Sequence, residues 1–157
     1  MEELREVMRR WVAGVSVVTA RHDNLMHGMT VNSLTSVSID PPRIVVTLAI
    51  KTRTHQLVLE SGLFGVSILS ADQQEISDRF AGRIPDDGNR SEGVEVDYLV
   101  ESIPVIEHCL AQLACKVVHV YEMPNSSLFV AEVLEGRVSS EKAALVYANR
   151  RYQRLEL

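Results

Sequence analysis

The stretch Gly28-Met-Thr-Val-Asn-Ser-Leu-Thr-Ser-Val-Ser-Ile-Asp-Pro-Pro42 interleaves small polar side chains with apolar ones. Its polar members are one amide and five hydroxyls, on Asn32 and on Thr30, Ser33, Thr35, Ser36 and Ser38. A half-buried strand that faces a polar ligand needs this alternation, whereas a surface loop does not. Small hydroxyls suit a flat polar heterocycle, because they offer hydrogen bonds without filling the space that the ligand needs. A hydroxyl-rich edge strand would show the same pattern, so both interpretations stay open at this point.

The size and composition of the chain indicate a single domain, residues 1–157. Hydrophobic residues make up 46% and charged residues 24%, an ordinary globular profile. The formal charge is −5 and no basic patch is interleaved with aromatic residues, which argues against a nucleic-acid partner. No apolar run approaches the roughly 20 residues that span a membrane, and the acidic N-terminus has no signal-peptide core. Because Cys109 and Cys115 make no disulfide framework, we expect a reduced, cytoplasmic protein.

Helical periodicity is clearest at the N-terminus. Residues 2–12 place apolar side chains on one face of a helix, namely Leu4, Val7, Met8, Trp11 and Val12. We expect this helix to dock as a lid on the chain that follows. Two more short helices are expected, at residues 55–61 and after the capping-box spacing of Ser70 and Gln73.

The remaining periodicity predicts strands joined in antiparallel hairpins. They are expected at residues 15–20, 26–31, 44–50, 63–69, 110–121, 128–138, 143–147 and 152–155. The run at 44–50 is almost unbroken in apolar residues, so we expect it to be buried on both faces. Residues 84–97 indicate a long loop. The pattern predicts an α+β fold dominated by an antiparallel sheet, in which closure into a barrel would hide the edge strands.

Lys51-Thr-Arg-Thr54 stands immediately before one of the predicted helices. Two cations and two hydroxyls at a helix start make a reasonable anion site, because the free backbone N–H groups and the helix dipole add to the side chains. A solvated strand end with routine charges explains the same residues equally well.

Other chemistries find little support in the sequence. Neither Gly-x-x-x-x-Gly-Lys nor Gly-x-Gly-x-x-Gly occurs, so nicotinamide use would have to occur without a Rossmann fold. The spacing of Cys109, Cys115 and His119 is not that of a zinc site, and Cys115 fits better as a small core residue, so we predict no metal. No Gly-x-Ser-x-Gly elbow is present, and we predict no catalytic side chain.

Six segments in order resemble the flavin reductase-like family, the FMN-binding split barrels that include the small components of two-component flavin monooxygenases. They are residues 11–19, the stretch from Gly28 through Ser36-Val-Ser38 to Pro42, Lys51-Thr-Arg-Thr54, Arg79-Phe-Ala-Gly82, Leu128-Phe-Val-Ala-Glu-Val133, and Leu145-Val-Tyr147 through Tyr152. The resemblance implies a six-stranded Greek-key split β-barrel, a homodimer, and FMN or FAD held near the dimer interface. It also implies NADH or NADPH as the co-substrate and a flavin-dependent monooxygenase as the recipient of reduced flavin. Such a reaction needs no side-chain acid or nucleophile, because the flavin carries the chemistry.

The resemblance also assigns binding roles by position. The isoalloxazine ring would be lined by Thr30, Val31, Asn32 and Ser33, with Ser36 close by. The phosphate would be held by the turn of Lys51, Thr52, Arg53 and Thr54. Phe80, Arg150 and Tyr152 would lie at the rim of the pocket.

The sequence departs from the family pattern in two places. Many members carry Gly-Asp-His, whose His is implicated in nicotinamide binding, where this chain has Asn125-Ser-Ser127. Many also carry His where this chain has Ala148. An FMN-binding electron carrier or flavin-binding protein without pyridine-nucleotide reductase activity therefore stays open as an alternative, as does a split-barrel sensor or interaction module without flavin.

Overall fold

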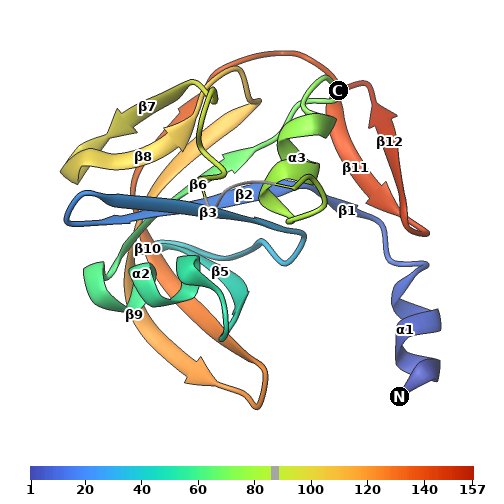
Figure 1. Cartoon of the computed structure of the whole chain (residues 1–157), viewed down its shortest axis with the longest axis horizontal. Helices are drawn as coiled ribbons and strands as arrows, with labels where there is room; N and C mark the ends of the chain where they lie inside the picture. Colours follow the sequence, from blue (N-terminus) through green and yellow to red (C-terminus); the bar gives the residue numbers. More distant parts are fainter. Residues whose placement is uncertain (86–88) are drawn as a thin grey trace.

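The computed structural model describes residues 1–85 and 89–157, and its largest feature is a seven-stranded antiparallel sheet (Figure 1). In sheet order its strands are β3 (Leu25–Val31), β2 (Ser16–His22), β6 (Leu63–Ile68), β9 (Ala111–Glu122), β10 (Ser126–Val138), β5 (Pro42–Ala49) and β4 (Thr35–Ile39). The hairpins β2–β3 and β9–β10 are the two expected from the sequence. The expected α+β fold with a mainly antiparallel sheet and short helices is confirmed.

Two smaller sheets flank the large one. A three-stranded sheet has the order β1 (Ala13–Gly14), β11 (Ala144–Ala148) and β12 (Arg151–Leu155). A separate hairpin pairs β7 (Val96–Leu99) with β8 (Ile103–Ile106) around the 3₁₀ turn η1 (Val100–Ser102). The sequence did not predict this hairpin, because strands of four residues are too short for alternation to show. Part of the loop expected at 84–97, residues 86–88, lies outside the described residues.

Three helices accompany the sheets: α1 (Glu2–Met8), α2 (Arg53–Ser61) and α3 (Gln74–Phe80). α2 is capped at both ends, since Thr52 Oγ1 accepts a hydrogen bond from the His55 N–H at 3.2 Å and Gly62 adopts a left-handed φ of 69°. α3 begins later than expected, because the Ser70 hydroxyl donates to Asp72 instead of capping the helix. None of the described helices combines the length and the apolar character needed to cross a membrane.

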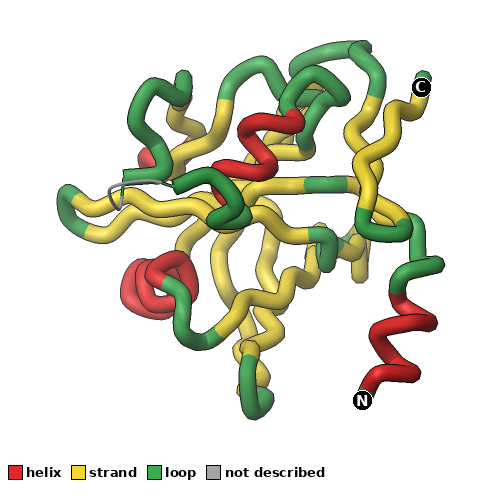
Figure 2. Tube along the Cα trace, turned by 45° about the vertical axis from the view of Figure 1, so that its right-hand side comes forward, coloured by secondary structure: helices red, strands yellow, loops and turns green. Residues whose placement is uncertain are grey.

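The N-terminal helix differs most from expectation. α1 ends at Met8 and buries none of its residues, so the prediction that it docks as a lid on the following chain is wrong. Figures 1 and 2 show it standing away from the sheet at the end of the chain marked N. The apolar side chains of its stripe are exposed by about half or more, with Leu4 at 55%, Val7 at 65% and Met8 at 51%.

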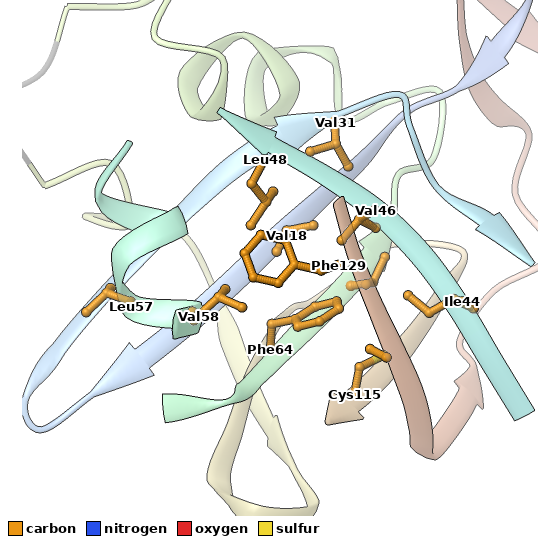
Figure 3. Close-up of a cluster of buried hydrophobic side chains, with 13 residues drawn as sticks. Val18, Val31, Ile44, Val46, Leu48, Leu57, Val58, Phe64, Cys115 and Phe129 are labelled. Carbon is orange, nitrogen blue, oxygen red and sulfur yellow. The ribbon is translucent and has the colours of Figure 1, made fainter. Parts of the chain in front are cut away.

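The main core lies between the curled large sheet and α2 (Figure 3). Phe64 and Phe129 are fully buried at its centre, with Val18, Val46 and Leu48 around them. Strands β2, β3, β5, β6, β9 and β10 and helix α2 all contribute to this one cluster. Burying apolar side chains at about 25 cal/mol per Å² makes such a cluster the main source of stability.

Strand β5 is buried on one face rather than on two. Ile44, Val46 and Leu48 are buried, whereas the residues between them are only half-buried. The expectation of two buried faces is therefore wrong. Its reason is the sheet geometry: successive side chains point to opposite sides, and only one side faces the core.

The stretch from Gly28 to Pro42 forms two strands and a loop rather than a single strand. β3 ends at Val31, residues 32–34 make the loop, and β4 pairs back onto β5 after a turn that contains the cis Asp40–Pro41 bond. Gly28 is required for packing, because a Cβ atom there would lie 2.7 Å from Phe80 Cδ1. α3 therefore lies directly against β3.

The sheet order ends at β3 on one side and β4 on the other. Within residues 1–85 and 89–157, no backbone pairing joins these two edge strands. The sheet has seven strands where the family resemblance implied six, because β4 adds to the edge of β5.

Candidate functional site

A groove of about 770 Å³ lies beside the loop at residues 32–34. Its walls come from α1, β1, this loop and the turn between β11 and β12, and include Arg5, Trp11, Asn32, Ser33, Thr35 and Arg150. The groove therefore combines apolar surface from the N-terminal segment with amide, hydroxyl and guanidinium groups. That mixture suits a large, partly polar ligand.

Ser33 fixes the loop to the end of β5. Its Oγ accepts a hydrogen bond from the Thr47 N–H at 3.0 Å and lies 3.3 Å from the Thr47 carbonyl. The Ser33 hydroxyl is thus held by Thr47, while the neighbouring Asn32 side chain is exposed on the groove wall. Asn32 and the loop backbone are the groups best placed to contact a ligand there.

A smaller cavity of about 160 Å³ adjoins the groove and shares Asn32 and Tyr147 with it. Its remaining walls are Val15, Thr30, Val31, Ser77, Ala81, Arg83 and Tyr152. The Thr30 hydroxyl donates to the Ser77 carbonyl at 2.7 Å, so β3 and α3 are joined at this wall.

Arg83 is the cation of the smaller cavity. Its guanidinium lies 5.5 Å from the ring centre of Tyr147 and 5.7 Å from that of Tyr152, and donates to both phenol oxygens. The hydrogen bond to Tyr147 raises the pKa of Arg83, which keeps the positive charge. Burial raises the pKa of Tyr152, whose hydroxyl donates to Asp78 at 2.8 Å. Tyr152 therefore keeps its proton, and the wall carries the positive charge of Arg83.

The turn before α2 places its four residues in two different environments. Lys51 and Arg53 are exposed, and Thr52 is the N-cap. Thr54 is fully buried, and its Oγ1 lies 2.8 Å from Nδ1 of His27. The cations therefore face outward while the Thr54 hydroxyl faces the interior.

The structure places six of the twelve predicted ligand-binding residues on the walls of the groove or the smaller cavity. Asn32 and Ser33 line the groove beside the end of β5, where Ser33 is bonded to Thr47. Thr30, Val31 and Tyr152 line the smaller cavity, and Arg150 lines the groove.

The other six predicted residues line neither cavity: the four residues of the turn at 51–54, Phe80 and Ser36. Phe80 is fully buried in the second core cluster, against Gly28, and lines neither the groove nor the smaller cavity. Ser36 is exposed on β4 opposite Ile44, and it too lines neither of them.

Several site residues were not predicted from the sequence. Arg5, Arg9 and Trp11 line the groove, although the sequence suggested only a packed amphipathic helix. Ser77 and Arg83 line the smaller cavity, and the signal for Arg83 was its position directly after Arg79-Phe-Ala-Gly82. Cys115 is a core residue as expected, and burial raises its pKa to about 12, so this thiol is unreactive.

A family model described as the flavin reductase like domain matches residues 8–156. This chain belongs to that family. The match covers the groove-lining segment after Met8, the loop at 32–34, the turn at 51–54 and both strands that carry Tyr147 and Tyr152.

Relatives in the flavin reductase-like family match the chain along its length. The reductase component of 4-hydroxyphenylacetate 3-monooxygenase from Thermus thermophilus is 35% identical over 156 residues, which cover 98% of this chain and 96% of the relative. The reductase component of an FADH2-dependent resorcinol hydroxylase from a Rhizobium species is 35% identical and covers 96% of this chain and 85% of the relative.

A solved structure agrees with the fold. The flavin reductase component of a bacterial two-component tryptophan halogenase is 34% identical, with a TM-score of 0.90 over 99% of this chain and 98% of that one.

Position 127, where the sequence departs from many family members, lies inside the protein. Ser127 is fully buried on β10, and its Oγ lies 2.8 Å from Nε2 of His55. A side chain here points at α2 rather than into the groove. The identity of this residue therefore says little about access of a ligand to the groove.

Proposed function

We propose that this chain is an NAD(P)H:flavin oxidoreductase, which transfers a hydride from NADH or NADPH to FMN or FAD. The observation that carries the proposal is the family match over residues 8–156, which contains both the loop at 32–34 and the turn at 51–54. Relatives named as reductase components of a monooxygenase and of a hydroxylase support a further step, the supply of reduced flavin to a flavin-dependent monooxygenase.

The site fits a flavin in size and chemistry. A groove of about 770 Å³ lies within the range of roughly 300–1,000 Å³ typical of cofactor sites. Asn32 and the backbone of residues 30–33 would line the ring, with Arg150 nearby. Lys51, Arg53 and the start of α2, which lie outside the groove lining, would hold the phosphate. The bound flavin would supply the chemistry as a hydride acceptor. The protein would bind the ring, align it and exclude water from it.

The competing interpretation, a flavin-binding protein that does not use NAD(P)H, is disfavoured by the relatives named as reductase components. It rested on Ser127 in place of a nicotinamide-binding His. Because Ser127 is buried and its hydroxyl is hydrogen-bonded to His55, we assign no nucleotide contact to position 127.

The proposal includes a homodimer and a barrel. The N-terminal segment exposes an apolar stripe, with Leu4 at 55%, Val7 at 65% and Trp11 at 67% exposure, and residues 1–85 and 89–157 do not bury it. We assign the cover of this stripe to a second copy, next to the groove that α1 borders. Six strands surrounding one core support closure of the large sheet into the family's split barrel. The free thiols of Cys109 and Cys115 agree with a cytoplasmic location.

The test is oxidation of NADH and of NADPH by the purified protein, with and without FMN or FAD. We expect nucleotide oxidation only when flavin is present, and bleaching of the flavin spectrum under anaerobic conditions. No nucleotide oxidation at any flavin concentration, from a folded protein that binds flavin, would overturn the reductase proposal. A colourless protein that gains no thermal stability from FMN would overturn flavin binding itself.

A further inference from the structure

Two buried side chains in the first turn of α2 are each hydrogen-bonded to a different part of the large sheet. Thr54 Oγ1 lies 2.8 Å from His27 Nδ1 on β3. His55 Nε2 lies 2.8 Å from Ser127 Oγ on β10. Since β2, β6 and β9 separate β3 from β10 in the sheet order, the two bonds hold the turn from two sides.

All four side chains are enclosed. Thr54 and Ser127 are fully buried, while His55 is 5% exposed and His27 is 8% exposed. The His55 ring also packs edge-on to Phe129, with ring centres 5.4 Å apart. Buried polar groups that lose their partner are costly, so these pairs strongly favour one position of the turn.

The outer side of the same turn carries the cations. Lys51 and Arg53 are exposed on either side of Thr52, whose Oγ1 accepts from the His55 N–H and donates to the Ala49 carbonyl at 2.8 Å. His55 is therefore joined to the N-cap through its backbone and to β10 through its ring. A displacement of the ring would shift the N-cap and the helix start together.

We propose that His55 and Ser127, together with His27 and Thr54, are positioning residues that hold the turn at 51–54 in the orientation that binds the flavin phosphate. The inference rests on the proposed function, which places the phosphate at this turn. It gives the Thr54 hydroxyl a different role from the ligand contact expected from the sequence, because that hydroxyl faces His27. Charge-assisted bonds to phosphate depend on geometry, so a loosened turn weakens phosphate binding while the ring site is unchanged.

The experiment compares FMN with riboflavin, which differ only in the phosphate. Titration of each flavin gives two Kd values, and the ratio of the riboflavin Kd to the FMN Kd reports the phosphate site alone. We expect a ratio of roughly tenfold or more for the unaltered protein. Ser127→Ala and Thr54→Val remove one hydroxyl each with little change in volume. Each should lower the ratio roughly three- to tenfold, with the riboflavin Kd changed by less than about twofold.

Two further variants separate positioning from general stability. His55→Gln places an amide near the position of Nε2 and should keep most of the ratio, whereas His55→Leu should lose it. Ser61→Ala is the matched control, because Ser61 lies at the other end of α2 and its hydroxyl donates to the Leu57 carbonyl at 2.8 Å. It should lower the melting temperature and leave the ratio unchanged.

The outcomes separate this inference from the proposed function. A high ratio in the unaltered protein that persists in Ser127→Ala and Thr54→Val would overturn the positioning role. A ratio near one in the unaltered protein would overturn the phosphate site and this inference with it, while flavin-dependent NADH oxidation would still support the reductase. If His55→Leu fails to fold, the two near-isosteric variants decide the question.

Discussion

Helices α1 and α2 carry similar apolar stripes and end in opposite environments. Leu57 on α2 is 3% exposed and Val58 is fully buried, whereas Leu4 on α1 is 55% exposed. α2 follows β5 through a short turn and packs onto β2, β3, β5 and β6. α1 is followed by residues 9–12, which lead to β1, and it stands away from the sheet (Figure 2).

The contrast shows what an amphipathic pattern does and does not specify. The pattern states that one face of a helix needs cover, because exposed apolar area is unfavourable. It does not show whether that face packs against the same chain or against another molecule. α2 is covered by its own chain, and we propose that α1 is covered by a second copy.

The largest expected effect comes from the same substitution made in both helices. Leu57→Ala should lower the free energy of unfolding by roughly 2–5 kcal/mol, because it opens a cavity in the main core. Leu4→Ala should change it by less than about 0.5 kcal/mol. Urea unfolding at a protein concentration that keeps the chain monomeric measures both. Equal losses would show that α1 packs on its own chain after all.

A charge on the apolar stripe tests what covers α1. Leu4→Asp should weaken self-association at least about tenfold, because it places an unpaired carboxylate in an apolar contact. Leu25→Asp is the matched control, since Leu25 is 61% exposed at the β2–β3 turn, away from α1. Sedimentation over a range of concentrations gives both dissociation constants. Identical behaviour of the two variants, or an unaltered protein that never associates, would remove the second copy from the proposal.

The glycines that follow the two helices should respond differently to alanine. Gly62 ends α2 with a φ of +69°, and a Cβ atom there would meet no other atom within 4 Å, so the whole cost is conformational. Gly62→Ala should therefore cost about 1 kcal/mol. Gly14, also without neighbours within 4 Å, has no left-handed φ, and Gly14→Ala should be close to neutral. Thermal unfolding of both variants checks this, and a neutral Gly62→Ala would contradict the assigned cap.

The sequence predicted those features that depend on local pattern. Both long hairpins and the stop of α2 at Gly62 follow from alternation and capping chemistry, whereas α2 begins at Arg53, two residues before the expected start. The hairpin β7–β8 was missed because its strands are too short for a period to show. α3 begins after Gln73 because the Ser70 hydroxyl bonds to Asp72 instead of capping the helix. The capping-box spacing alone does not show which of these two bonds the hydroxyl makes.

The candidate site was predictable in part for the same reason. Asn32 and Ser33 belong to one contiguous motif, and both line the groove, whereas Lys51 of the second motif does not. Thr54 pairs with His27, and Ser127 pairs with His55. The members of each pair are distant in sequence and become neighbours only when the sheet curls. Long-range pairs of this kind leave no periodic signal in a single sequence.

The smallest expected effect is on the pH dependence of stability, and it arises at α2, since α1 contains no histidine. Burial lowers the pKa of His55 from its ordinary value of 6.5, and the nearby charge of Glu122 partly opposes this. Below that value the unfolded chain binds a proton that the folded chain does not bind. The stability that the neutral His55 contributes is therefore fully present above about pH 6.5. It is lost as the pH falls toward the lower pKa of His55 in the folded protein.

Replacing the imidazole should remove this dependence. The fall in unfolding free energy between about pH 8 and pH 5 should be smaller in His55→Gln than in the unaltered protein. Ser61→Ala provides the control, because it removes a hydrogen bond of the same helix, from the Ser61 hydroxyl to the Leu57 carbonyl, without removing a titratable group. Urea unfolding at several pH values measures the difference. A His55→Gln variant with the same pH dependence as the unaltered protein would mean that the His55–Ser127 pair accepts a proton without cost, which its enclosure beneath α2 argues against.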